Sequence, residues 1–547
     1  MLDWLTAQKT DHPMHSIEEA ERLLTGLSGE PLQALEEVAS WLTTLAQAAG
    51  FSLATRMAVI RLVDESGQPF EPELTRLYFD ARAQSEFERM QLWQAALHFW
   101  ERVEHAYRVC IDELQRDPKL LRTYQDELAL LIVRMLRALA NQARLLRLRY
   151  IPVREALWQA LFDVYRASEI AGCDNQRVIA YPGDTLPTSA RQELLRAAML
   201  DTVQPDSMLP HETELAARIT ARYADAFLFD PAPKAGCNWT LDLAASRPPE
   251  LATGVAALRP TARFFGAGAV MVKLNEVIRR LTAEPSAKEQ RFGAEYTSQE
   301  KLRVLRRLTR HWGEHPPQRS EIRRSVTATL AVTCGFAAAC LRIPRAQFRG
   351  WRRVLDTMDA ALLTRLGITA DPVALPAQET WTQHDTSTWG MSAAIPRASE
   401  ATVTIGTLCT LKSGDPLWWI GVVRRLYRDN DEHVNAGIEV LAKKPATVLL
   451  RRIGHGGMSV QDWSKASDAT GNDYLNVILL GASRTEKRRH ELLLARGEFI
   501  AGLVYEAMLG DDKQHFKLEE LIEHGECFDR VSFTRVSNAQ ASVSAPA

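Results

Sequence analysis

The sequence has few cysteines, and none of them is spaced for a metal site. Its 547 residues include seven scattered cysteines, an odd number, with no Cys-x-x-Cys pair. This pattern argues against both a disulfide framework and a structural zinc site. Reduced, scattered cysteines are typical of a reducing compartment. We therefore expect a cytoplasmic protein without a metal ion.

The chain also lacks a long apolar run and an excess of one charge. Its longest apolar run, about residues 328–341, is shorter than the roughly 20 residues that span a bilayer. The first residues contain no basic stretch followed by an apolar one, so we see no signal peptide. The formal net charge is only -2, which does not favour nucleic-acid or membrane binding. We expect no transmembrane segment and no nucleic-acid partner.

The length of the chain predicts several domains. At 547 residues it exceeds what one hydrophobic core supports, so two to four domains are expected. The composition, 46% hydrophobic and 24% charged, is ordinary for globular proteins. The patterns along the chain predict a multidomain α + β protein, with a large all-α N-terminal region followed by an antiparallel β-barrel or sandwich.

The N-terminal third has the apolar spacing of amphipathic helices. From residue 16 to about 168, apolar residues recur every three or four positions with charged residues between them. We expect a helical domain over residues 1–180, with a break at Asp117-Pro118, because proline disfavours helix in the residue before it. Two segments resemble the first helix of a tetratricopeptide unit, although they lie 58 residues apart and the repeat should be 34. Core aromatics are the simpler interpretation of these residues, which are Trp100, Val103 and Tyr107, then Trp158, Leu161 and Tyr165.

Four arginines are spaced to share one face of a helix near residues 128–150. They are Arg134, Arg137, Arg144 and Arg147. Such a stripe can dock an acidic partner, but more often it is the solvated side of a helix. We therefore expect it to face solvent.

Residues 181–312 are interrupted by proline and glycine and predict a second helical or mixed module. Breaks at 181–183, 209–210, 230–231 and 248–249 exclude long helices there. Helix resumes over 299–312 and ends before Pro316-Pro317.

After residue 325 the pattern changes to β-branched, alternating strands. We expect strands at 325–336, 401–411, 417–427, 435–442, 446–453, 474–480 and 499–509, separated by polar turns. They predict a β-barrel domain over 313–455 and an additional β region over 456–536. A helical insertion at about 342–370 interrupts the barrel, and residues 537–547 form a disordered tail.

Two short motifs precede and follow the first of these strands. One is Arg-x-x-x-Arg in a linker, and the other is Asp-x-Ser-x-x-Gly on what we expect to be the next strand. Their residues are Arg319, Arg323 and the neighbouring Arg324, then Asp385, Ser387 and Gly390. In this order they resemble the signatures of the PilZ domain family of bacterial cyclic di-GMP receptors. The strands at 417–427 and 435–442 also resemble the middle of a PilZ barrel. The resemblance implies an antiparallel six-stranded PilZ-like β-barrel with extra C-terminal strands.

The arginines suit a guanine nucleotide on chemical grounds. A guanidinium can hold the O6 and N7 acceptors of guanine with two hydrogen bonds, and phosphates accept the same donors. Arg319 and Arg323, with Arg324, are therefore suited to contact both base and phosphate.

The second motif supplies complementary groups. Asp385 is an acceptor for the N1 and N2 donors of guanine. Ser387 offers a small hydroxyl near the ring or phosphate, and Gly390 permits close approach of a ligand or a neighbouring chain to the backbone. Sixty-one residues separate Arg323 from Asp385, more than is usual in PilZ domains. If the insertion displaces the first strand, the arginines cannot reach Asp385.

The resemblance implies a cyclic di-GMP receptor that couples nucleotide binding at the barrel to an unknown protein partner of the helical region. Such a protein is not an enzyme and needs no cofactor. The alternative is a scaffold with a degenerate PilZ barrel that binds no nucleotide. Trp389, Trp418 and Trp419 would then anchor a protein interface. Because neighbouring strand residues face opposite sides, at least one of Trp418 and Trp419 is expected in the core.

Overall fold

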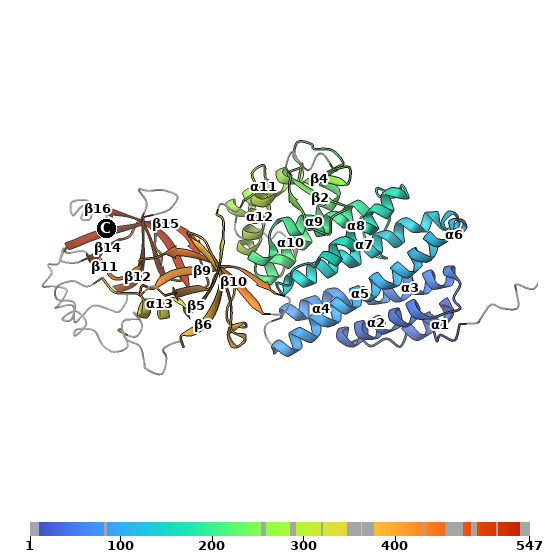
Figure 1. Ribbon diagram of the computed structural model, residues 1–547, viewed down its shortest axis with the longest axis horizontal. Coiled ribbons are helices and arrows are strands. Elements are labelled where there is room, and N and C mark those ends of the chain that lie inside the picture. The colour runs from blue at the N-terminus through green and yellow to red at the C-terminus, as the bar shows by residue number, and fades with distance from the viewer. Residues whose placement is uncertain are drawn as a thin grey trace, which may run out of the picture. The chain divides into compact units, whose positions relative to one another are not determined.

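The protein forms two compact units, residues 1–318 and 319–547, in a computed structural model (Figure 1). The residues that the structure describes are 10–80, 85–252, 259–284, 292–318, 321–346, 363, 377–414, 416–429, 433–453, 474–482, 490–509 and 512–536.

The first unit is built mainly from helices, as the apolar spacing predicts. Ser85 begins the longest with a reciprocal capping box to Glu88, and Asp117 separates two helices by accepting from the backbone of Lys119, 2.8 Å away. The helical elements are α1 (Ile17–Leu24), α2 (Pro31–Gln47), α3 (Leu53–Gly67), α4 (Phe70–Phe79), α5 (Glu86–Arg116), α6 (Pro118–Thr123), α7 (Gln125–Leu148), α8 (Glu155–Ile170), α9 (Ala190–Thr202), η1 (Pro205–Ser207), α10 (Pro210–Arg222), η2 (Ala224–Ala226), α11 (Val270–Ala283) and α12 (Ser298–Trp312). None of the described helices is long and apolar enough to cross a membrane.

Helix α7 is central to this unit and contacts α5, α8, α9 and α10. The six aromatic and aliphatic residues at tetratricopeptide-like spacing are buried in one hydrophobic core, which confirms their interpretation as core residues. That core runs from Met14 to Trp312 and so includes the second predicted module. The predicted division at residue 180 falls inside this single unit.

The arginine face of α7 does not face solvent, so that prediction is wrong. Arg134 is 2% exposed and lies 3.5 Å from the carboxylate of Asp64. The other three guanidiniums are bound by carboxylates from helices or loops at least 47 residues away along the chain. These pairs are Arg137 with Asp184 and Glu193, Arg144 with Glu71 and Glu214, and Arg147 with Asp201. The arginines therefore join helices inside the unit rather than presenting a docking surface.

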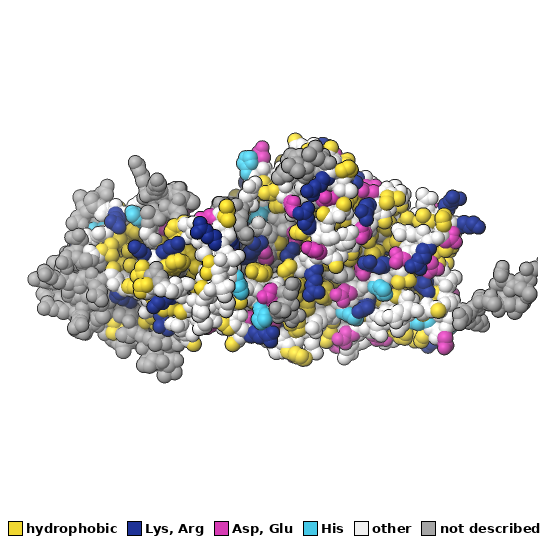
Figure 2. All heavy atoms as spheres, viewed as in Figure 1, with side chains coloured by type: hydrophobic (Ala, Val, Ile, Leu, Met, Phe, Trp, Pro, Cys, Tyr) yellow, Lys and Arg dark blue, Asp and Glu magenta, His cyan; other side chains and the backbone are white. Residues whose placement is uncertain are grey.

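A small sheet completes the second module, which is mixed in structure. Its antiparallel strands are β1 (Leu228–Asp230), β2 (Trp239–Asp242), β3 (Glu250–Leu251) and β4 (Ala262–Gly266), in the order β1-β4-β2-β3. Trp239 fixes this sheet to α12 by donating from its indole nitrogen to the carbonyl oxygen of His311, 3.2 Å away. On the face drawn in Figure 2, acidic and basic side chains are interspersed over the helical unit.

Acid is expected to destabilise the first unit through His311. This side chain is 4% exposed, and its Nδ1 lies 3.1 Å from the carbonyl oxygen of Thr202. Burial, with the charges of Arg307 and Arg310, lowers the pKa of His311 to about 4. Because an unfolded histidine has a pKa near 6.5, the unfolded chain binds the extra proton between about pH 6.5 and 4. Stability contributed by the neutral ring is therefore lost as the pH falls through this window.

His311→Gln tests this expectation. The variant should lose part of the pH dependence of the thermal unfolding midpoint between pH 7.5 and 5, a contribution of about 2 kcal/mol in the native protein. The exposed His15→Gln is the control and should leave the dependence unchanged. An unchanged slope in His311→Gln would contradict the assignment.

The second unit consists of two closed antiparallel six-stranded barrels, which confirms the predicted fold class. The first has the order β10-β7-β6-β5-β8-β9 and the second the order β11-β12-β13-β16-β15-β14. Strands of the first barrel are β5 (Arg324–Cys334), β6 (Glu379–Thr386), β7 (Gly390–Ala394), β8 (Leu408–Lys412), β9 (Trp419–Arg428) and β10 (Val434–Ala442). Those of the second are β11 (Ala446–Arg452), β12 (Tyr474–Ala482), β13 (His490–Ala495), β14 (Val504–Leu509), β15 (Asp512–His524) and β16 (Phe528–Val536).

The two barrels share an apolar interface. Ile420 and Val422 of β9 and Leu441 of β10 cluster with Ile478 and Phe528 of the second barrel. Arg424 adds a polar link, since its guanidinium binds Glu439 of β10 at 2.8 Å and Glu523 of β15. The second barrel is therefore packed against the first and is not a loose appendage.

The insertion begins at the interface and leaves the motif end of the first barrel undisturbed. A short helix, α13 (Phe336–Arg342), follows β5 and packs on β5, β8 and β12. Most of the predicted helical insertion, residues 347–362 and 364–370, lies outside the described residues, as does the predicted tail. Val332 of β5 pairs with Glu379 of β6, whereas Ser325 pairs with Asp385. At a strand rise of about 3.3 Å per residue, the end of β6 that the insertion joins lies about 20 Å from Asp385.

Candidate functional site

The Asp-x-Ser-x-x-Gly motif forms a hairpin and not a single strand. Asp385 lies near the end of β6, Ser387 is in the turn, and Gly390 begins β7. The backbone nitrogen and the hydroxyl of Ser387 both donate to the carbonyl oxygen of Gly390, at 2.7 and 3.3 Å. The same hairpin therefore forms both a turn between strands and a cluster of polar side chains.

The linker motif lies on this hairpin. Nη1 of Arg323 is 2.8 Å from each carboxylate oxygen of Asp385, and both side chains are 25% exposed. The contact uses one of the three guanidinium nitrogens, so Nε and Nη2 are not needed for it. Two residues earlier, Glu321 accepts a 3.3 Å hydrogen bond from the backbone nitrogen of Trp389. Despite the 61 residues between them, the two predicted motifs meet.

The other predicted arginines differ from Arg323 in placement. Arg324 is the first residue of β5, is exposed, and pairs in register with Thr386 of β6. Arg319 lies outside the described residues. The described part of the linker therefore brings one guanidinium to Asp385 and starts a strand with the next.

Asp385 is bordered by residues that the sequence analysis did not single out. Its Cα partners are Ser325 on β5 and Ser392 on β7. Burial and the charge of Asp385 raise the pKa of Tyr427 on β9, while Arg323 opposes this effect. Glu321 could have been suspected from its position between the two arginines of the motif, but only the barrel closure brings Tyr427 to the site.

Gly390 is held closely by its neighbours. A Cβ atom there would lie 3.2 Å from the hydroxyl oxygen of Ser387 and 3.6 Å from the carbonyl oxygen of Ile438. The strand beyond it pairs with β10, in which Glu439 is opposite Gly390. The glycine therefore permits a tight hairpin against β10.

Trp389 lies in the turn of the hairpin and Trp419 lies near it, and neither is fully buried. The Nζ atom of Lys443 lies 5.4 Å from the ring centre of Trp389 and 4.8 Å from that of Trp419. Trp418 is near Arg342 and Lys412 instead. Trp418 and Trp419 are both half-buried, so the expectation that one of them is a core residue is wrong. Cationic side chains cover these rings on the outside of the barrel.

This cluster offers one guanidinium donor and one carboxylate acceptor side by side. Arg323 and Asp385 neutralise each other, and both remain a quarter exposed. A ligand with acceptors for a guanidinium and donors for a carboxylate could replace that pair with two complementary contacts. Among the residues described, no group of three or more His, Cys, Asp or Glu side chains could hold a metal ion.

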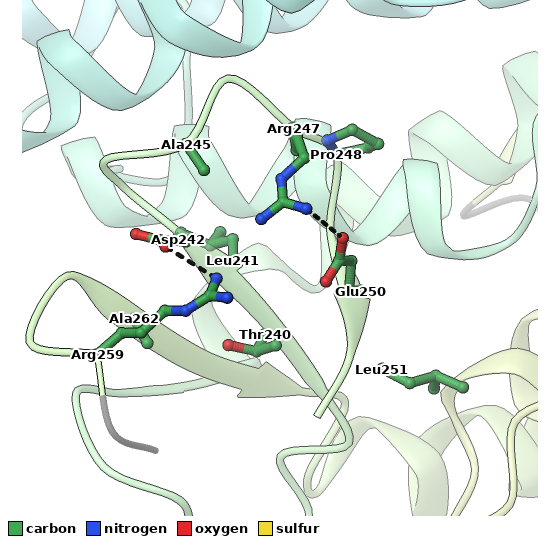
Figure 3. Close-up of a pocket in the computed structure, with 10 residues that line it drawn as sticks. All are labelled: Thr240, Leu241, Asp242, Ala245, Arg247, Pro248, Glu250, Leu251, Arg259 and Ala262. Atoms are coloured by element: carbon green, nitrogen blue, oxygen red, sulfur yellow. Dashed lines mark hydrogen bonds and ion pairs between the residues drawn. The ribbon is translucent and has the colours of Figure 1, made fainter. Parts of the chain in front are cut away.

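A cavity beside the small sheet of the helical unit does not suit a nucleotide. It measures about 90 Å³, and ion pairs border it, Arg247 with Glu250 at 3.6 Å and Arg259 with Asp242 at 3.1 Å (Figure 3). Small-molecule sites usually measure about 300–1,000 Å³, so this cavity is too small.

Comparison with known proteins bears on the helical unit. Residues 18–233 match the family model described as the cyclic-di-GMP receptor FimW, N-terminal domain. The match covers less than half of the chain and none of the first barrel. A search of curated proteins found no match. The chain is therefore similar, over most of its helical unit, to the N-terminal domain of a nucleotide receptor.

Proposed function

We propose that this protein is a cyclic di-GMP receptor that acts by binding and not by catalysis. The first barrel is then a PilZ-like domain, and its ligand-binding residues are Arg319, Arg323, Arg324, Asp385, Ser387 and Gly390. The observation that carries the proposal is the contact of Arg323 with both carboxylate oxygens of Asp385, at 2.8 Å. The similarity of residues 18–233 to the N-terminal domain of a cyclic-di-GMP receptor supports it independently.

In this proposal, nucleotide binding replaces the contact between Arg323 and Asp385 with one contact from each of them to the nucleotide. Arg323 leaves Asp385 and binds O6 and N7 of guanine or a phosphate, while Asp385 accepts from N1 and N2. The linker carries Arg323 and Glu321 together, so its displacement would also break the Glu321 contact with the backbone of Trp389. Binding would thereby free the segment that joins the barrel to the helical unit.

The helical unit is the proposed site for a protein partner, and the proposed location is the cytoplasm. Coupling requires that the nucleotide bind the two linker conformations with different affinity. The Arg323–Asp385 ion pair provides that difference in affinity, because it forms only when the linker contacts the hairpin.

Calorimetric titration of the full chain with cyclic di-GMP tests the proposal. We expect a dissociation constant in the micromolar range or below, and at least tenfold weaker binding in Arg323→Ala, since one guanidinium contact to a base contributes about 1–3 kcal/mol. Arg397→Ala is the matched control, because Arg397 is an exposed arginine of the same barrel. Its affinity should equal that of the native chain.

The alternative is a scaffold that binds no nucleotide, in which Arg323 and Asp385 serve only each other. In that case the titration gives no heat at tens of micromolar nucleotide. A partner of the helical unit would then bind equally well with and without cyclic di-GMP.

A further inference from the structure

A second polar cavity, of about 400 Å³, opens inside the helical unit and is independent of the first barrel. It lies where α4, α5, α7, α9 and α10 meet, and its wall lies within residues 68–221. Its size is within the range usual for small-molecule sites. The small side chains of Ala140, Ala217 and Ala221 form part of the wall, which leaves room for a ligand.

The wall is rich in charged side chains, and Asp184, Glu193 and Glu295 beside it also pair with its arginines. Four arginines and two glutamates line it, namely Arg137, Arg144, Arg196 and Arg218 with Glu71 and Glu214. Guanidinium groups recognise carboxylate and phosphate through paired hydrogen bonds. An anion in the cavity would therefore meet guanidinium donors.

The charges on the wall are not equally satisfied. Arg144 binds two carboxylates, those of Glu71 and Glu214. Arg196 instead shares Glu193 with Arg137, at 3.0 Å from one oxygen, while Arg137 is 2.9 Å from the other. Burial and then the charges of Arg137 and Arg144 lower the pKa of Arg196, against the opposing effect of Glu193. Arg196 is therefore the guanidinium with most to gain from a further anion.

Arg196 is also accessible from two sides. It lines the 400 Å³ cavity and a neighbouring cavity of about 270 Å³, and its side chain is 26% exposed. Asn141 adds an amide to the wall of the larger cavity, and its oxygen accepts from Nε of Arg144 at 3.3 Å. An anion there would find donors of two chemical types.

We propose that this cavity binds the phosphate group of a small phosphomonoester, with Arg196 as its principal contact and Arg218 and Asn141 beside it. A phosphomonoester carries a charge near -2 at neutral pH and offers three acceptor oxygens, and these oxygens match the guanidinium and amide donors of the wall. Arg137 and Arg144 keep their internal carboxylates and hold the wall in place.

Titration of the full chain with inorganic phosphate and with O-phosphoserine, at constant ionic strength, tests this proposal. We expect saturable binding with a dissociation constant below about 1 mM, equivalent to about 4 kcal/mol. Arg196→Gln should weaken it at least fivefold. Arg279→Gln is the matched control, since Arg279 also pairs with a glutamate three residues earlier but is exposed on α11. It should bind as the native chain does.

A second variant separates a lost contact from a lost fold. Ala217→Leu keeps every charge and fills the cavity, so it should also weaken phosphate binding, whereas Ala54→Leu on the exposed face of α3 should not. Circular dichroism checks that each variant is folded. No saturable heat with either probe, or binding unchanged in both Arg196→Gln and Ala217→Leu, would overturn the proposal. Asp385→Ala is expected to leave phosphate binding intact, so this result does not depend on the barrel.

Discussion

Arg134→Met is expected to cost the helical unit about 3–5 kcal/mol of unfolding free energy at neutral pH, because it leaves a buried charge without its partner. Arg134 donates from Nε to the carbonyl oxygen of Ala180 at 2.7 Å and from Nη1 to the hydroxyl of Tyr107 at 2.9 Å. Asp64, 3.5 Å away, is fully buried. Chemical denaturation of the full chain, monitored by helix content, measures the loss.

The pH dependence of that loss identifies its cause. Burial raises the pKa of Asp64 even with Arg134 present. Without the guanidinium, the folded protein should bind a proton at Asp64 more strongly than the unfolded chain does, so the deficit of Arg134→Met should shrink as the pH falls from 7 to 5. Adding Asp64→Asn to Arg134→Met should recover part of the stability at pH 7. Arg279→Met, at an exposed pair, should cause no measurable change.

Asp385→Ala is expected to weaken cyclic di-GMP binding at least 100-fold and to remove most of its preference for guanine. On the proposed function, Asp385 accepts from the N1 and N2 donors of the base, a contact that adenine cannot make. The native chain should therefore reject cyclic di-AMP. The variant should bind both dinucleotides weakly and with similar affinity, held mainly by arginine contacts to phosphate.

Competition titrations with the two dinucleotides give this result directly. Asp385→Asn is a more specific test than Asp385→Ala, since it keeps the size of the side chain and exchanges one acceptor for a donor. Glu400→Ala is the control, because Glu400 is a carboxylate of the same barrel that pairs with Arg428 at 3.1 Å. An Asp385 variant that still discriminates guanine from adenine would refute the assigned role.

Elements with a local cause could be predicted from the sequence. The helices before residue 170 follow from apolar spacing, and strands β5, β9, β10 and β12 follow from alternating β-branched residues. Strand β15, which contains Leu518-Glu519-Glu520-Leu521, was missed because that spacing is helical. Its partners β14 and β16 hold it extended, with register shifts at Leu518 and Leu521.

Only the part of the candidate site that lies in the two motifs could be predicted from the sequence. Arg323 and Asp385 could be paired from their motifs, whereas the hairpin geometry and the approach of Tyr427 depend on closure of the barrel. The arginine face of α7 was misinterpreted because helical periodicity places residues on a face but does not show what covers it. The carboxylates that bind Arg137 and Arg144 come from helices or loops 47 to 73 residues away.

The joint core of the two barrels limits how this protein can be divided or recombined. Only residues 443–445 separate β10 from β11, and Ile478, Leu493 and Phe528 complete an apolar cluster begun in the first barrel. A gene fragment that ended after β10 would leave that cluster facing water. The two barrels consequently form one folding unit, and truncation after β10 is expected to destabilise the first barrel.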